Sequence, residues 1–98
     1  MTYSIKEIDF ETLKKTNSNI TDIINEFYEF YLVNKQKIEK NVNDFFTDTE
    51  IQPQIDVIIG FQIIDNYNRL LFNIELKILD LKGDKLSFEL INIKKITS

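Results

Sequence analysis

Carboxylates are the main side chains of this sequence that could act in acid–base or metal chemistry. The chain has no His and no Cys, which removes the commonest general base, the commonest zinc ligands and the thiol nucleophile. The two glycines, Gly60 and Gly83, are isolated, so no phosphate-binding glycine-rich loop is present. We therefore expect a protein that is not an enzyme, with no catalytic residues and no cofactor.

Two groups of carboxylates are spaced closely enough to act together. Asp22, Glu26 and Glu29 stand at i, i+4 and i+7, which places them on one face of a helix. That face could bind a cation or a basic partner, or it could simply be solvated near a positive helix N-terminus. The second group surrounds a predicted helix-to-sheet junction and consists of Asp44, Asp48, Glu50 and Asp56. Neither group has the ligand loop of an EF-hand, so we expect no metal site.

Exposed aromatic side chains are the other candidates for function. The run Phe27-Tyr28-Glu29-Phe30-Tyr31 places four rings in five helical positions, and they cannot all face one sheet. Tyr28 is the ring predicted to be exposed, and tyrosine beside acids is a common interface composition. Tyr67 and Arg69 lie in a predicted turn, where an ordinary turn role is the alternative. The predicted partner-binding residues are Asp22, Glu26, Tyr28, Glu29, Tyr67 and Arg69.

Composition restricts the class of protein and its surroundings. The 98 residues, with 43% hydrophobic and 29% charged side chains, fit one globular domain over 1–98. The net charge of −4 comes from the first fifty residues, which hold ten acids against six lysines. That imbalance argues against nucleic-acid binding. No apolar run approaches a membrane span, and the first residues do not resemble a signal peptide. We expect a cytoplasmic location, in the producing cell or an infected host.

Residue usage indicates the kind of genome. Ile, Asn and Lys supply 38 of the 98 residues, and alanine is absent. Codons for the first three are AT-rich and those for alanine are GC-rich. The sequence therefore indicates an AT-rich genome, such as that of a low-GC bacterium, its phages or its plasmids.

Hydrophobic periodicity predicts an α+β fold. A long N-terminal helix is expected over about 19–45, with Asn34 in its apolar stripe marking either a break or a helix that projects towards another subunit. Strands are expected over about 54–65, 69–80 and 85–95, with Gly83 as the positive-φ residue of the second turn. Residues 3–8 could form a short strand, or a helix that begins with a capping box at Ser4. The prediction is a helix packed on a three- to four-stranded antiparallel β-meander.

The first predicted strand is too apolar for an exposed edge. Ile58 and Ile64 lie on its second face, and the phase of the last strand slips so that Ile91 and Ile93 leave the alternating pattern. This slip indicates either a β-bulge near 90–92 or a second apolar face. Residues 3–8, a second copy or a partner could cover the first strand. The predicted oligomer interface is Ile58, Ile64, Ile91 and Ile93, and a dimer is the favoured homo-oligomer.

These observations support three hypotheses about function. The first is a small acidic protein-binding module that inhibits or regulates a partner protein, of the immunity or phage- or plasmid-encoded anti-defence type. The second is a structural or assembly subunit of a homo-oligomer. The third is a holder of extended or apolar ligands on an exposed sheet face. The partner in the first hypothesis is another protein, with no nucleic acid and no membrane involved.

Overall fold

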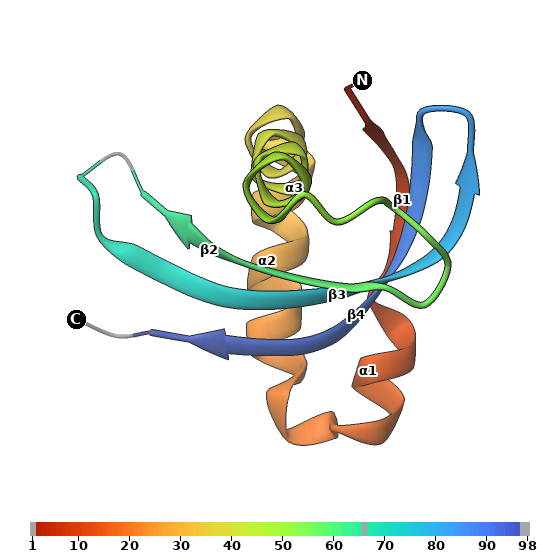
Figure 1. Cartoon of the computed structure of the whole chain (residues 1–98). Coiled ribbons are helices and arrows are strands. Elements are labelled where there is room, and N and C mark those ends of the chain that lie inside the picture. The colour runs from red at the N-terminus through yellow and green to blue at the C-terminus, as the bar shows by residue number, and fades with distance from the viewer. Residues whose placement is uncertain (1, 66, 97–98) are drawn as a thin grey trace.

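The computed structural model describes residues 2–65 and 67–96 and shows an α+β fold (Figure 1). Strands and helices follow the chain as β1 (Ser4–Asp9), α1 (Glu11–Thr16), a 3-10 turn (Ser18–Ile20), α2 (Thr21–Val33), α3 (Lys35–Thr49), β2 (Ile58–Ile64), β3 (Leu70–Lys82) and β4 (Lys85–Lys95). Among the described residues, no helix is long and apolar enough to cross a membrane.

The strands form one mixed sheet in the order β1-β4-β3-β2. The β2–β3 and β3–β4 pairs are antiparallel, as expected for a meander. The prediction of a purely antiparallel sheet is wrong, because β1 pairs with β4 in the parallel direction. A parallel neighbour needs a long crossover connection, and the whole chain from α1 to β3 lies between these two strands. The segment 3–8 is thus a strand, but it lies at the opposite edge from β2 and does not cover it.

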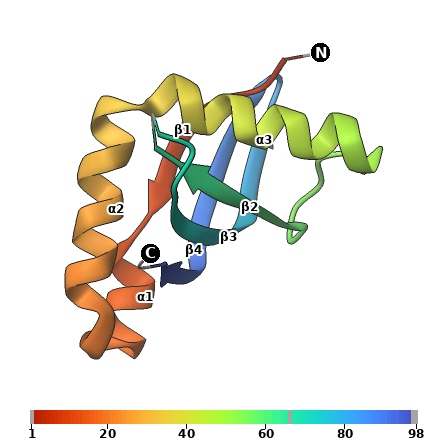
Figure 2. The same cartoon turned by 90° about the vertical axis from the view of Figure 1, so that its left-hand side faces the viewer.

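The helix predicted over about 19–45 is divided into two helices, because the chain bends at Asn34; a break at this residue was one of the two alternatives given by the sequence. Asn34 leaves the helical region with φ −121° and ψ 35°, and both its backbone N–H and its side-chain amide donate to Phe30 O, at 2.9 and 3.1 Å. A short polar side chain that bonds the backbone in this way competes with helix continuation. Figure 2 shows α2 and α3 meeting at a sharp bend, with α3 crossing above the strands. Helix α1 precedes both, so the long helical segment does not begin the chain.

The core lies between the sheet and these helices. Ile59 and Ile63 of β2 are fully buried there, with Ile74 and Leu76 of β3, and α3 packs against β2. Helix α2 contributes Phe27, whose ring lies 5.8 Å from that of Phe72. The inner face of β2 is therefore covered by the chain's own helix α3.

A β-bulge in β4 explains the slip of phase in the last strand. Glu75 pairs with Asn92 and Leu76 with Leu90, so Ile91 is the extra residue. The bulge returns Ile93 to the core, where only 6% of its surface is exposed. Gly83 has φ 61° in the β3–β4 turn, as predicted.

The two edges of the sheet are finished differently. At the β1 edge, α3 supplies hydrogen bonds: Glu39 Oε2 accepts from Ile5 N (2.7 Å), and Asn43 Oδ1 accepts from Tyr3 N (2.7 Å). Asn43 Nδ2 also donates to Tyr3 O at 2.9 Å. At the β2 edge, the Lys37 ammonium donates to Ile64 O. These side chains satisfy backbone groups that an edge strand otherwise leaves open to pairing.

Candidate functional site

A groove of about 710 Å³ lies where the end of β1 meets α1 and α2. We call it the Tyr28 groove. Its lining comes from five elements and from Phe10, the residue that joins β1 to α1. The other lining residues are Glu7, Ile8 and Asp9 of β1, Glu11 and Lys14 of α1, Asn25 and Tyr28 of α2, Leu79 of β3 and Phe88 of β4. A volume of this size lies within the usual range for sites that hold a small molecule or a few side chains.

Aromatic packing forms one wall of the Tyr28 groove. Tyr28 is 42% exposed, and its ring meets the buried ring of Phe10 edge-to-face at 5.2 Å. Phe10 in turn lies 5.8 Å from Phe27 and 5.9 Å from Tyr31, both in the core. The contact with Phe10 therefore holds Tyr28 in place while part of its ring stays open to solvent. Leu79, also partly exposed, adds an apolar surface.

Carboxylates dominate the polar lining. The groove holds Glu7, Asp9 and Glu11 against a single cation, Lys14, and Lys14 Nζ is paired with Glu11 at 3.3 Å. The negative charge attracts cations, and the adjacent low-dielectric ring surface strengthens such attraction over that in open water.

Asp9 has a structural role within this lining. Its Oδ2 accepts from the Thr12 hydroxyl at 2.6 Å, and its Oδ1 accepts from the backbone N–H groups of Glu11 (2.9 Å) and Thr12 (3.2 Å). These hydrogen bonds, that from the Thr12 hydroxyl above all, lower the pKa of Asp9 below its ordinary value. Asp9 thus stays ionised at neutral pH, a state that suits cation binding better than proton donation. Its hydrogen bonds also satisfy the first N–H groups of α1.

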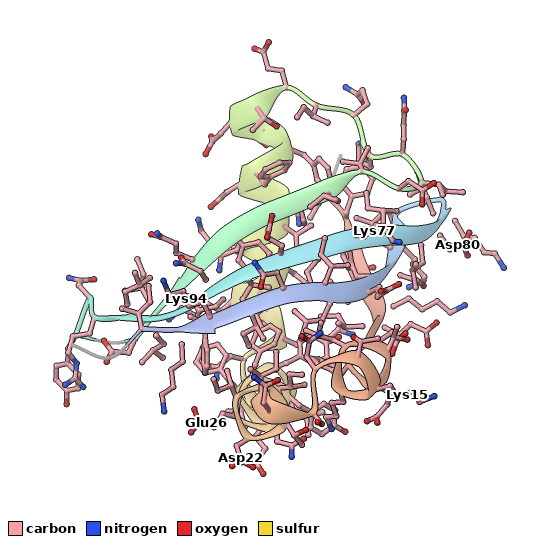
Figure 3. All side chains as sticks on the ribbon, turned by 90° about the horizontal axis from the view of Figure 1, so that it is seen from below. Lys15, Asp22, Glu26, Lys77, Asp80 and Lys94 are labelled. Carbon is pink, nitrogen blue, oxygen red and sulfur yellow. The ribbon has the colours of Figure 1, made fainter. Side chains whose placement is uncertain are left out.

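The acidic face of α2 is separate from the Tyr28 groove. Asp22, Glu26 and Glu29 are all exposed, but none of them lines the groove. Glu26 pairs with Lys95 of β4 at 3.0 Å, and Figure 3 shows Asp22 and Glu26 together at the outer side of α2. In the structure Tyr28 therefore lines a groove with residues of β1 and α1. The carboxylates of Asp22, Glu26 and Glu29, which the sequence grouped with Tyr28, lie outside that groove.

Tyr67 and Arg69 lie on the β2–β3 turn, away from the groove. Tyr67 is 79% exposed, and the Arg69 guanidinium lies over its ring at 5.2 Å. In Figure 1 this hairpin projects from one side of the molecule, and α1 lies on the other. The two predicted sets of partner-binding residues thus occupy different places in the fold.

The four isoleucines of the predicted oligomer interface do not form one surface. Ile58 and Ile64 are 49% and 40% exposed, Ile91 is half-buried at the bulge, and Ile93 belongs to the core. The face of β2, β3 and β4 that no helix crosses is turned to the viewer in Figure 3. Polar side chains occupy its middle, including an Asn92–Glu75 hydrogen bond of 2.9 Å and a Lys77–Glu89 ion pair of 3.9 Å.

Within the described part of the chain, no three carboxylates come close enough to hold a metal ion. Glu7, Asp9 and Glu11 were not among the predicted site residues, although a signal was present. In Glu7-Ile8-Asp9-Phe10-Glu11 acids alternate with apolar residues, and alternate residues of a strand share a side, as Glu7 and Asp9 do at the end of β1. Glu11 joins them from the first position of α1.

Comparison with known proteins gives no family for this chain: no family model, no curated protein and no solved structure matches it.

Proposed function

We propose that this chain is a protein-binding module that inhibits or regulates its partner, and that the Tyr28 groove is the contact surface. The observation that carries the proposal is the combination, in one cavity of about 710 Å³, of an anchored, half-open tyrosine with three carboxylates and one cation. Exposed tyrosine in a recess is typical of residues that dominate binding energy at interfaces.

The lining also defines what the partner presents. An excess of carboxylates favours a lysine or arginine side chain, and the exposed parts of Tyr28 and Leu79 favour an aromatic or apolar neighbour. We therefore propose a partner segment that carries a cationic side chain next to an aromatic one. The mild net charge of −4 suits such a partner without making the protein a mimic of nucleic acid.

A small probe tests the proposal before any partner is known. Acetyl-Tyr-Arg-amide, titrated into ¹⁵N-labelled protein, is expected to shift the backbone resonances of Glu7 to Glu11 and of Asn25 to Tyr28. Acetyl-Tyr-Glu-amide at the same concentration is expected to leave them in place, because its carboxylate is repelled. Shifts that are absent, or that fall elsewhere on the molecule, would contradict the proposal.

A matched pair of variants separates the groove from the acidic helix face. Glu7→Gln/Glu11→Gln removes two charges from the Tyr28 groove, and Asp22→Asn/Glu29→Gln removes two from the exposed face of α2. Only the first is expected to weaken binding of acetyl-Tyr-Arg-amide by severalfold. If the second weakens it instead, the contact surface is the acidic face of α2.

A further inference from the structure

Asp65 is hydrogen-bonded to Tyr67 and Arg69 at the tip of the β2–β3 hairpin. Its Oδ1 accepts from the backbone N–H groups of Tyr67 (2.8 Å) and Arg69 (2.9 Å), and its Oδ2 accepts from Arg69 Nε at 2.9 Å. Asn68 provides the positive φ, 60°, that the turn needs, and asparagine tolerates this region. A side chain that is ordered before binding loses less conformational entropy when it binds.

This tip presents the same chemistry that the Tyr28 groove is suited to hold. Tyr67 is largely exposed, with the guanidinium of Arg69 over its ring. Asp65 accepts from the Nε–H of that guanidinium, and within residues 2–65 and 67–96 its two terminal nitrogens donate no hydrogen bond. Their four N–H groups can therefore bond carboxylates. Arg69 is also the single arginine of the sequence. The groove offers Glu7 and Glu11 for the guanidinium, and Tyr28 with Leu79 for the ring.

The tip and the groove of one chain cannot meet. Figure 1 shows the β2–β3 hairpin projecting to one side, whereas α1, which borders the groove, lies on the opposite side beyond β4. A contact between them must join two molecules. Because it uses different surfaces on the two molecules, it is a heterologous contact, which continues head-to-tail into rings or chains.

We propose that the β2–β3 tip of one copy docks into the Tyr28 groove of a second copy. This inference rests on the proposed function for the chemistry of the groove. It adds that, in the absence of a partner, the groove of each copy is filled by the tip of a neighbouring copy. Two anchoring side chains bury an area well below that of a stable interface, so the association is weak and reversible. A partner with a cationic and aromatic segment then competes with self-association, and partner binding disperses the chains.

Sedimentation velocity over about 10 µM to about 1 mM protein tests the contact, a range chosen for weak association. The weight-average mass of the native chain is expected to rise with concentration and to fall back in high salt, because salt screens the carboxylate–guanidinium attraction. The tip variant Tyr67→Ser/Arg69→Gln and the groove variant Glu7→Gln/Glu11→Gln are each expected to stay monomeric. Both keep the backbone bonds of the turn and the packing of the core.

Mixing the two variants gives the sharpest result. The tip variant still has an intact groove and the groove variant an intact tip, so an equimolar mixture is expected to form a 1:1 heterodimer that grows no further. A mixture that stays monomeric overturns the proposal. So does a native chain that is monomeric throughout, or self-association that survives in the tip variant and is lost in Ile58→Lys/Ile64→Lys.

The dipeptide probe separates failure of this inference from failure of the proposed function. If acetyl-Tyr-Arg-amide shifts the groove resonances while the native chain stays monomeric, docking of the tip is refuted and the proposed function stands. If the probe does not bind and the chain stays monomeric, both are refuted. Binding of the probe together with dissociation of native oligomers supports both.

Discussion

Replacing Asn43 by alanine tests the inference that α3 closes the β1 edge of the sheet. Asn43 joins the helix to Tyr3 through two hydrogen bonds, accepting from Tyr3 N at 2.7 Å and donating to Tyr3 O at 2.9 Å. Both are partly buried, so each is expected to contribute about 0.5–1.5 kcal/mol. Alanine regains up to about 0.7 kcal/mol in helix propensity over asparagine. The net loss in the free energy of unfolding is then about 1–2 kcal/mol.

Urea denaturation followed by circular dichroism measures that loss, and thermal unfolding is expected to shift Tm down by about 5–15 °C for a domain of this size. Hydrogen exchange locates the effect. The Tyr3 amide is expected to lose protection, because its acceptor is gone, while the Ile5 amide keeps its bond to Glu39. Amides in the β2–β3 pair are expected to keep their protection except through global unfolding.

Asn41→Ala provides the matched control on the same helix. Asn41 Nδ2 donates to Lys37 O, one turn back on the same helix, at 3.1 Å. Its loss is expected to change stability by no more than about 0.5 kcal/mol, since the gain in propensity offsets a local bond. Equal stability of the two variants, with unchanged exchange at Tyr3, would refute the closure of the β1 edge by Asn43.

Two further predictions concern α1 and the bulge. Asp9→Ala is expected to cost about 1 kcal/mol at pH 7 through loss of the hydrogen bonds that begin α1. Because the pKa of Asp9 is lowered in the folded protein, its contribution is present above the unfolded pKa of about 3.9 and is lost as pH falls through the folded value. The difference in the free energy of unfolding between the native chain and the variant, measured by urea titration, should therefore be larger at pH 7 than near pH 2.5. Deleting Ile91 removes the bulge and leaves regular alternation from Leu90 to Ile93, so we expect cooperative urea unfolding to persist. Deleting Glu89 instead brings Phe88 and Leu90 into adjacent positions, and the free energy of unfolding should fall by several kcal/mol, as when a large core side chain is lost.

Local pattern was enough to predict the parts of the fold that depend on neighbouring residues. The alternation of β3 is confirmed by Phe72, Ile74, Leu76 and Ile78, which are all buried. Gly83 has its positive φ, and the bulge near 90–92 was one of the two alternatives for the slip of phase. In each case the physical cause, the period of a strand or the steric freedom of glycine, acts within a few residues.

The pairing of β1 could not be predicted in the same way. Its partner β4 lies some eighty residues further along the chain, and either edge of a three-stranded sheet was open to it by sequence. The bend at Asn34 turns α3 over the sheet, where Glu39 and Asn43 bond the backbone of Ile5 and Tyr3, and these long-range contacts leave no local pattern in the sequence. The Tyr28 groove was not predicted, because it too depends on contacts between segments far apart in the sequence. Its lining comes from five elements that only the full topology brings together.

The sequence predicts that the apolar strand β2 needs a cover, and the chain supplies one for its inner face. Helix α3 buries Ile59 and Ile63, and Lys37 binds the carbonyl of Ile64 at the edge. The bulge at Ile91 also moves Ile93 into the core, which takes one side chain away from the predicted apolar face. An interface built on that face would therefore rest on Ile58 and Ile64 beside a polar strip. The recessed aromatic and acidic side chains of the Tyr28 groove, and the ordered Tyr67–Arg69 pair, offer binding chemistry that the open sheet face does not. Surface mutagenesis should begin at these two places.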